Sequence, residues 1–281
     1  MHSPLEIAQN YVEVCIHKVR LSALKMFVLG MFAGIFIALA GIAATTIAVT
    51  ISNPTLARIL SAAIFPAGLC MVLIAGSELF TGNTLIIMAL LEKKVTLPQM
   101  LKNWFFVLLG NTAGALLVSM LVVYGHTPSL YGNALAESIV SIAQVKASLG
   151  FGDAFIRGIL CNILVCLAVW MSFAAKHVEG KVMISYFPIF IFVLCGFEHS
   201  IANMYYLFTG LLTAAEYGIA AEGLSLFTAI FHNLLPVTLG NLFGGCGIVG
   251  FGYWAMYLHR TPGSHVSIEE EQEELLHAEE Y

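Results

Sequence analysis

The sequence predicts an all-helical integral membrane protein with six transmembrane helices in an inverted repeat, of which the second and fifth are broken. The chain is 59% hydrophobic and only 10% charged, with a mean hydropathy of +0.88. Several apolar stretches exceed the length of about 20 residues that crosses a hydrocarbon core. Two of these stretches carry glycine and polar residues at comparable places. The composition excludes an ordinary water-soluble globular domain.

Residues 1–25 are expected to form an amphipathic helix on the cytoplasmic side, lying at the membrane interface. Ser3 to Glu6 have the form of a capping box, with Pro4 at the first helical position. Apolar residues then recur at helical spacing from Leu5 to Val19. The alternative is a simple flanking linker. The apolar stretch that begins near Met26 has no small-residue cleavage site after a short core, which indicates a retained span instead of a signal peptide.

Residues 26–260 are expected to form the pore domain, with spans at roughly 26–49, 59–91, 104–125, 153–175, 183–208 and 227–258. Six spans place both ends of the chain on one side of the membrane. If that side is cytoplasmic, only Arg58, Lys146 and Arg157 of the 12 basic residues lie outside, in accord with the positive-inside rule. Residues 261–281 form an acidic tail, also expected in the cytoplasm, that carries seven of the 17 acidic residues.

The second and fifth spans are interrupted at corresponding positions, Gly76–Thr84 and Gly196–Asn203. The third and sixth spans also match, because Gly110-Asn111 and Gly240-Asn241 stand in the same local sequence pattern. A repeat unit of three spans gives an inverted repeat, and paired interruptions indicate a substrate site near the bilayer midplane. Irregular backbone at that depth is tolerated only where it is buried or lines a cavity. The architecture therefore predicts a transport pathway.

The interruption of the fifth span places Glu198, His199 and Asn203 inside a long apolar run. Ionisable side chains at bilayer depth are costly and are read first as functional, although a satisfied structural histidine is the alternative. On a helix His199 and Asn203 share a face, whereas Glu198 points elsewhere. Other polar candidates for the pathway are Thr81, Asn83, Asn162, His232 and Asn233.

A pathway with so few polar groups disfavours bare ions, because a charge in low dielectric costs several kcal/mol. It favours small neutral molecules, or a weak-acid anion that takes up a proton on the way. His199 can donate hydrogen bonds to an anion, and an unperturbed imidazole titrates near neutral pH. Lys146 stands in a poorly charged external connection and would draw anions to the mouth. The alternative for Lys146 is a solvated surface lysine, and the alternative for the neighbouring aromatic residues is core packing.

Several classes of protein are not supported. The six cysteines include no CxxC pair, so neither a disulfide framework nor a zinc site is indicated. No phosphate-binding loop or dinucleotide fingerprint is present. An intramembrane enzyme using His199 and Glu198 would lack an evident nucleophile or metal-ligand set. We therefore expect no enzymatic activity, cofactor, metal or nucleic-acid partner.

Four sequence blocks carry a resemblance to a known family: Gly76–Thr81 (GSELFT), Leu160–Met171 (LCNILVCLAVWM), Gly196–Met204 (GFEHSIANM) and His232–Gly244 (HNLLPVTLGNLFG). Through them, and over about residues 20 to 260, the chain resembles the formate/nitrite transporter family, which includes formate, nitrite and hydrosulfide channels. The resemblance implies an aquaporin-like protomer with its own pore, assembled as a homopentamer. It also implies that the N-terminal helix corresponds to a cytoplasmic segment proposed to cover the pore mouth at low pH.

The resemblance assigns a place to each candidate residue. Thr81 would face His199, Glu198 would support His199, and Lys146 would lie at the external end of the chamber. The polar side of the pathway would be extended by Asn162 and Asn233, beside Asn203 of the second interruption. The cytoplasmic constriction would be formed by Leu69, Leu79 and Phe192, and the external constriction by Phe65, Phe80 and Val165.

The expected function is transport of small monovalent weak-acid anions, formate or nitrite first, across the inner (plasma) membrane. The anion would be transiently protonated near His199, so that its partners are protons and the lipid bilayer. Hydrosulfide permeation is the alternative within the family. An aquaporin-like channel for neutral solutes is an alternative of another class, but Glu-Leu-Phe-Thr and Glu-His-Ser stand where that class carries Asn-Pro-Ala boxes.

Overall fold

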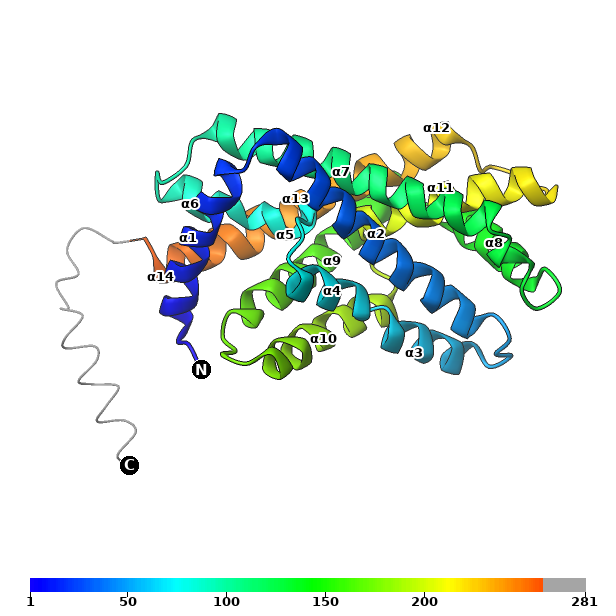
Figure 1. Ribbon diagram of the computed structural model, residues 1–281, viewed down its shortest axis with the longest axis horizontal. Helices are drawn as coiled ribbons and strands as arrows, with labels where there is room; N and C mark the ends of the chain where they lie inside the picture. The colour runs from blue at the N-terminus through cyan, green and yellow to red at the C-terminus, as the bar shows by residue number, and fades with distance from the viewer. Residues whose placement is uncertain (260–281) are drawn as a thin grey trace, which may run out of the picture.

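The computed structural model describes residues 1–259, which are helical apart from short turns and connections (Figure 1). The acidic tail predicted at 261–281 lies outside the described residues. Helix α1 (Pro4–Arg20) and helix α14 (Phe251–Tyr257) lie at one end of the molecule, and helix α8 (Ala134–Ala147) lies at the other. The two termini of the described chain are therefore at the same end.

Six helical segments are long and apolar enough to cross a membrane, as predicted. They are α2 (Ala23–Ala48), α3 with α4 (Pro54–Ile64, Ala67–Ala75), α7 (Leu97–Tyr124), α9 (Phe151–Ser172), α10 (Val178–Cys195), and the segment Leu226–Tyr257. Helix α7 begins before the expected residue 104, because Thr96 and Gln99 form a capping box and Pro98 stands in the first turn. The sixth segment comprises α12 (Leu226–Thr228), the π-helix η3 (Ala229–Leu234), α13 (Leu235–Leu242), the π-helix η4 (Phe243–Gly250) and α14.

Both predicted breaks are present, and both begin at a glycine in the left-handed region. Helix α4 ends at Gly76, with φ +79°, and α10 ends at Gly196, with φ +70°. After the first break come α5 (Phe80–Asn83), the 3-10 helix η1 (Thr84–Ile86) and α6 (Ile87–Leu91). After the second comes α11 (Ser200–Tyr217), which continues beyond the expected residue 208. Leu79 and His199, both extended, are the corresponding N-cap residues.

The two halves pack in the same way, through glycines that bring helices together. A Cβ at Gly110 of α7 would collide with the backbone of Phe27 in α2. A Cβ at Gly240 of α13 would collide in the same manner with the backbone of Phe155 in α9. Small residues at such crossings let helix backbones approach closely. The repeat seen in the sequence is thus a repeat of helix pairs, α2 with α7 and α9 with α13.

Helix α1 forms with its predicted capping box, since Ser3 Oγ accepts from Glu6 N–H and the Glu6 carboxylate accepts from Ser3 N–H. Its apolar face is not left for lipid. Ile7, Tyr11 and Val19 are buried in one cluster with residues of α6, α9 and the C-terminal helix. The protein itself covers this face, and the position of α1 at the membrane interface stays a prediction. Short turn η2 (Thr127–Ser129) precedes α8 at the other end.

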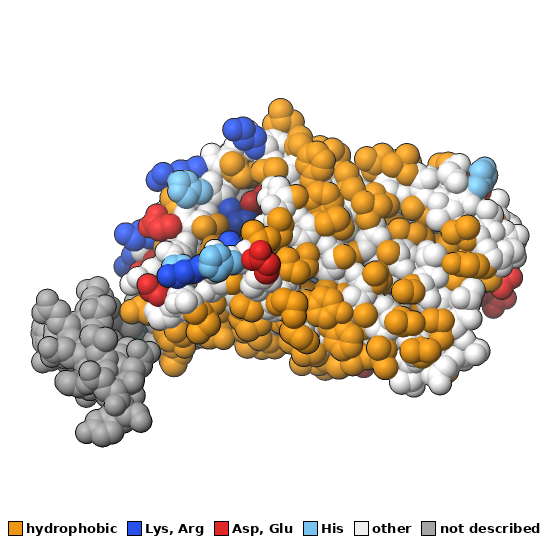
Figure 2. Space-filling model, turned by 60° about the horizontal axis from the view of Figure 1, so that its bottom comes forward, with side chains coloured by type: hydrophobic (Ala, Val, Ile, Leu, Met, Phe, Trp, Pro, Cys, Tyr) orange, Lys and Arg blue, Asp and Glu red, His pale blue; other side chains and the backbone are white. Residues whose placement is uncertain are grey.

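The surface carries the pattern of a membrane protein. Figure 2 shows basic, acidic and histidine side chains gathered at the end that holds α1, and a broad apolar surface over the body of the molecule. Many large apolar side chains are exposed on that body, among them Phe105 and Leu121 of α7 and Phe187 of α10. Such a surface suits contact with lipid or with neighbouring subunits.

Candidate functional site

Two cavities enter the protein from opposite ends and approach its two breaks. We call the first the Lys146 vestibule; it has a volume of about 320 Å³ and reaches Phe65, Phe192 and His199. The second, the Lys18 vestibule, has a volume of about 350 Å³ and reaches Leu69, Leu79 and Gly82. Lys18 belongs to α1 and Lys146 to α8, which lie at the two ends of the molecule.

Thr81 and His199 meet between these cavities. Their side chains are joined by a hydrogen bond of 2.8 Å between Thr81 Oγ1 and His199 Nε2, and Thr81 is fully buried. His199 is also the N-cap of α11, because its Nδ1 accepts from Ala202 N–H at 3.2 Å. An accepting Nδ1 carries no proton, so Nε2 of the neutral ring carries one and donates it to Thr81. The structure therefore contains the Thr81–His199 pair that the resemblance implies.

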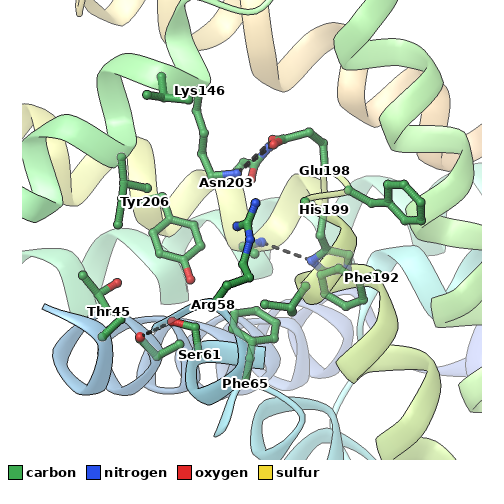
Figure 3. A pocket seen from close by; sticks show the side chains of 18 of the residues that line it. Thr45, Arg58, Ser61, Phe65, Lys146, Phe192, Glu198, His199, Asn203 and Tyr206 are labelled. Atoms are coloured by element: carbon green, nitrogen blue, oxygen red, sulfur yellow. Dashed lines mark hydrogen bonds and ion pairs between the residues drawn. The ribbon is translucent and has the colours of Figure 1, made fainter. Parts of the chain in front are cut away.

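Each vestibule is lined by three members of a four-residue polar cluster, and the cluster at Lys146 consists of residues predicted for the site. The Lys146 cluster consists of Lys146, Glu198, Asn203 and Asn233. Lys146 Nζ lies 3.0 and 2.9 Å from the two carboxylate oxygens of Glu198. Asn203 and Asn233 also donate to Glu198, and Asn233 donates to the backbone carbonyl of Lys146 at 3.0 Å. Figure 3 shows Lys146, Glu198 and Asn203 together on one side of the cavity.

The Lys18 vestibule holds the same arrangement, which we call the Lys18 cluster: Lys18, Glu78, Asn83 and Asn103. Lys18 Nζ lies 2.7 Å from Glu78 Oε1, and Asn83 donates to Glu78 Oε2 at 2.6 Å and to Asn103 at 2.9 Å. Asn103 in turn donates to the Lys18 carbonyl at 3.3 Å. This cluster was not predicted from the sequence. The repeat in the sequence could have revealed it. The interval from Lys18 to Lys146 equals the interval from Gly30 to Gly158, so the two lysines occupy corresponding positions of the two halves.

Two matching asparagines hold the broken backbones in place. Asn111 of α7 accepts from Phe80 N–H at 3.0 Å and donates to the Glu78 carbonyl at 2.9 Å. Asn241 of α13 accepts from Ser200 N–H at 2.9 Å and donates to the Glu198 carbonyl at 3.0 Å. Each asparagine thus supplies the hydrogen bonds that a broken helix in lipid cannot obtain from water. Both are fully buried.

Two predicted residues lie differently from expectation. Glu198 does not point away from Asn203; it accepts a hydrogen bond from it, because both residues belong to a break and a first helical turn instead of one regular helix. Asn162 lines neither cavity. Its amide group donates to the carbonyls of Thr81 and Asn241, so it connects the first break to α13.

The predicted constriction residues are all buried, in different surroundings. Leu69 and Leu79 line the Lys18 vestibule. Phe65 and Phe192 both line the Lys146 vestibule, with their rings edge to face at 5.7 Å. Phe80 packs against Trp104, with ring centroids 6.1 Å apart. Val165 lines neither vestibule. The division of these side chains into two constrictions, with Phe192 on the cytoplasmic side, stays a prediction.

A comparison with known proteins identifies this architecture. The sequence model described as "Formate/nitrite transporter" matches residues 5–255. The chain belongs to the formate/nitrite transporter family. It is 35% identical to the formate channel BtFdhC of Bacillus thuringiensis, over 91% of this chain and 96% of that protein. It is also 35% identical to the formate channel FocA of Escherichia coli K12, over 92% of this chain and 95% of that protein.

Solved structures of the formate/nitrite transporter family have the same fold. One described as an FNT family ion channel superposes with a TM-score of 0.81 and 31% identity, covering 89% of this chain and 98% of that one. Another, described as a pentameric formate channel with formate bound, gives a TM-score of 0.75 and 33% identity, over 84% of this chain and 98% of that one.

Within this family fold, the electrostatics of the two clusters limit what the lysines can do alone. Lys146 is balanced by Glu198, and Lys18 by Glu78, each at hydrogen-bonding distance. The side chains of these four residues are at most 19% exposed. A paired lysine presents ammonium protons to a ligand but adds little net charge, because the carboxylate cancels its field beyond a few ångströms.

Proposed function

We propose that this protein transports small monovalent weak-acid anions, with formate first and nitrite second, and is not an enzyme. The observation that supports this most is the Thr81–His199 pair, which stands between two lysine-bearing cavities and whose two side chains are both buried. The two channels compared above by sequence carry formate in their names. No cofactor or nucleic-acid partner is part of this proposal.

The proposed path begins at a vestibule, where the anion enters beside the lysine of one of the two clusters. The anion then passes apolar side chains, Leu69 and Leu79 from one end and Phe65 and Phe192 from the other. A bare charge in such surroundings costs several kcal/mol even after relaxation. Formate and nitrite escape this cost by taking up a proton, which chloride cannot do at neutral pH.

The centre of the path offers hydrogen-bond donors to the anion. When the Thr81–His199 bond opens, the Nε2–H of His199 and the hydroxyl of Thr81 both become available to an oxygen of the substrate. Hydrogen bonds to charged groups contribute about 1.5–3 kcal/mol each. Because Ala202 N–H occupies Nδ1, the ring stays neutral and only donates a hydrogen bond. The proton that neutralises the anion comes from water in the vestibule and leaves with the acid on the other side.

We further propose a homopentamer in the inner membrane, with one pore in each protomer and both termini in the cytoplasm. One compared structure is described as pentameric. The end that holds α1 carries most basic residues, in accord with the positive-inside rule. In this arrangement residues 1–25 cover the cytoplasmic side, 26–260 form the pore, and 261–281 form a cytoplasmic tail. The Lys146 vestibule then opens to the outside.

The test is anion uptake into proteoliposomes of the purified protein, comparing formate, nitrite, hydrosulfide and chloride. The proposal predicts saturable uptake of formate or nitrite and no uptake of chloride. Uptake of hydrosulfide without uptake of formate would show that the protein is a hydrosulfide channel of the same family. Osmotic swelling faster than that of lipid vesicles, without uptake of any of these anions, would support the aquaporin-like alternative and overturn the proposal.

A further inference from the structure

The two vestibules contain matching clusters but differ in net charge. The ionic side chains that line the Lys18 vestibule include one ammonium group, on Lys18, and one carboxylate, on Glu78. The lining of the Lys146 vestibule holds the corresponding pair and, in addition, Arg58 and Arg157. The duplication of the fold does not account for the two arginines. They give one vestibule a positive charge that its own carboxylate does not cancel.

Arg58 lies on the face of α3 that lines the cavity. Arg58, Ser61 and Phe65 follow one another at helical spacing and all line the Lys146 vestibule. At 1.5 Å per residue, Arg58 stands about 10 Å along the helix from Phe65. Its guanidinium group rests on the break of the fifth span, where a Cβ on Gly196 would lie 3.0 Å from Nη2. Figure 3 shows the Arg58 side chain directed into the cavity beside His199 and Tyr206.

Arg157 reaches the same cavity from α9, on another side of the break. Its backbone carbonyl accepts from Glu198 N–H at 3.3 Å, which fixes the start of its side chain next to the Lys146 cluster. Both arginines are exposed to the vestibule. Among residues 1–259, the ion pairs involve only His2, Lys18 and Lys146 as cations, so neither guanidinium group has a carboxylate partner there.

We propose that Arg58 and Arg157 form an anion-binding subsite in the Lys146 vestibule, which takes small carboxylates before they reach Phe65 and His199. A guanidinium group presents a planar fork of donors that matches a carboxylate bidentately, and it stays charged at any physiological pH. Lys146 is already held by Glu198, so the arginines supply the free positive charge. The substrate class of this subsite rests on the proposed function, whereas the positions of the two arginines do not depend on it.

The subsite is tested with methanesulfonate, a small anion of a strong acid. It can occupy an anion site but cannot become neutral, so it should block formate without following it. Vesicles are sorted by a tag at residue 1 into those that expose the α1 end and those that expose the other end. Methanesulfonate is added outside at constant ionic strength, and neutral dimethyl sulfone is the control ligand.

We expect methanesulfonate to inhibit formate uptake when it reaches the Lys146 face. Arg58→Gln and Arg157→Gln should each raise its inhibition constant about fivefold, which corresponds to roughly 1 kcal/mol at 1.4 kcal/mol per factor of ten. The double variant should show a shift of about 25-fold if the two contributions add. Arg20→Gln removes the same charge from the α1 end, where Arg20 is exposed outside both cavities, and should leave the constant unchanged.

Three outcomes would overturn the subsite: no inhibition of the wild type, equal inhibition from both faces, or an unchanged inhibition constant in the double variant. Arg58→Lys keeps the charge and should lose less affinity than Arg58→Gln, which separates binding from misfolding. Titration calorimetry with detergent-purified protein measures the affinity of methanesulfonate for the subsite independently of transport. Sulfonate binding that depends on the arginines in a protein that carries no formate would therefore refute the proposed function and leave the subsite standing.

Discussion

The ion pair between Lys146 and Glu198 gives the sharpest quantitative prediction. We consider Lys146→Met, Glu198→Gln and the double variant, because each removes charge with little change of side-chain volume. The Glu198 carboxylate accepts from Lys146 and from two amides, and the exposed fractions of the two charged side chains are 15% and 7%. The pair is therefore buried and well satisfied, which is the condition under which removing one partner is costly.

Removing one partner of a buried ion pair costs roughly 3–5 kcal/mol, whereas replacing both by neutral groups is often close to neutral. We expect the lower end, about 3 kcal/mol for each single variant, since Asn203 and Asn233 remain bonded to Glu198 and the vestibule admits water. The double variant should lose only about 1–2 kcal/mol. The coupling energy in the cycle is then roughly 4 kcal/mol.

Unfolding free energies of the four proteins in mixed micelles measure this coupling, and formate uptake measures its functional consequence. Lys146→Met leaves a lone negative charge beside the path and should weaken formate binding most. Glu198→Gln leaves a lone positive charge and should strengthen it, and the double variant should resemble the wild type. Single-variant effects that add to within about 0.5 kcal/mol would show that the two residues are independent and would refute the reasoning.

Two further predictions concern helix packing and the N-terminal helix. Gly110→Ala or Gly240→Ala should each lower the free energy of unfolding by about 3 kcal/mol, because the new Cβ meets a neighbouring backbone. Gly152→Ala, with open space around it, is the control, and equal losses in all three variants would contradict this packing. Hydrogen bonds from Ser3 lower the pKa of Glu6. The Glu6 carboxylate therefore stabilises α1 above about pH 4.5, and this contribution is lost as the pH falls through the lowered pKa. Amide exchange in α1 measures this pH dependence, which Glu6→Gln should abolish.

The architecture was readable from the sequence because lipid imposes simple rules. Apolar length gave the six spans, and glycine followed by polar residues gave both breaks. The matching Gly-Asn positions, Gly110-Asn111 and Gly240-Asn241, revealed the repeat. These features are local in the sequence, and in a membrane each has few structural solutions.

Contacts between distant segments were harder to predict. The residues around Lys18 do not predict its contact with Glu78, because that contact depends on how α1 packs against the rest of the protein. Helix α1 was expected to use its apolar face for the membrane, yet that face is buried in the protein. Similarly, Arg58 and Arg157 entered the sequence argument only through their side of the membrane. Their shared cavity follows from the approach of α3 and α9 to one break.

The central claim is that the anion crosses beside His199 with a proton. The most direct measurement records formate uptake and internal pH in the same vesicles, for the wild type and for His199→Asn. Asparagine can still cap α11, but it lacks the ring that presents a donor to Thr81. We predict one proton for each formate in the wild type and a loss of uptake of at least about tenfold in the variant, as expected for one hydrogen bond to a charged group. Uptake that follows membrane voltage without proton entry, or a variant that transports as the wild type does, would contradict the account.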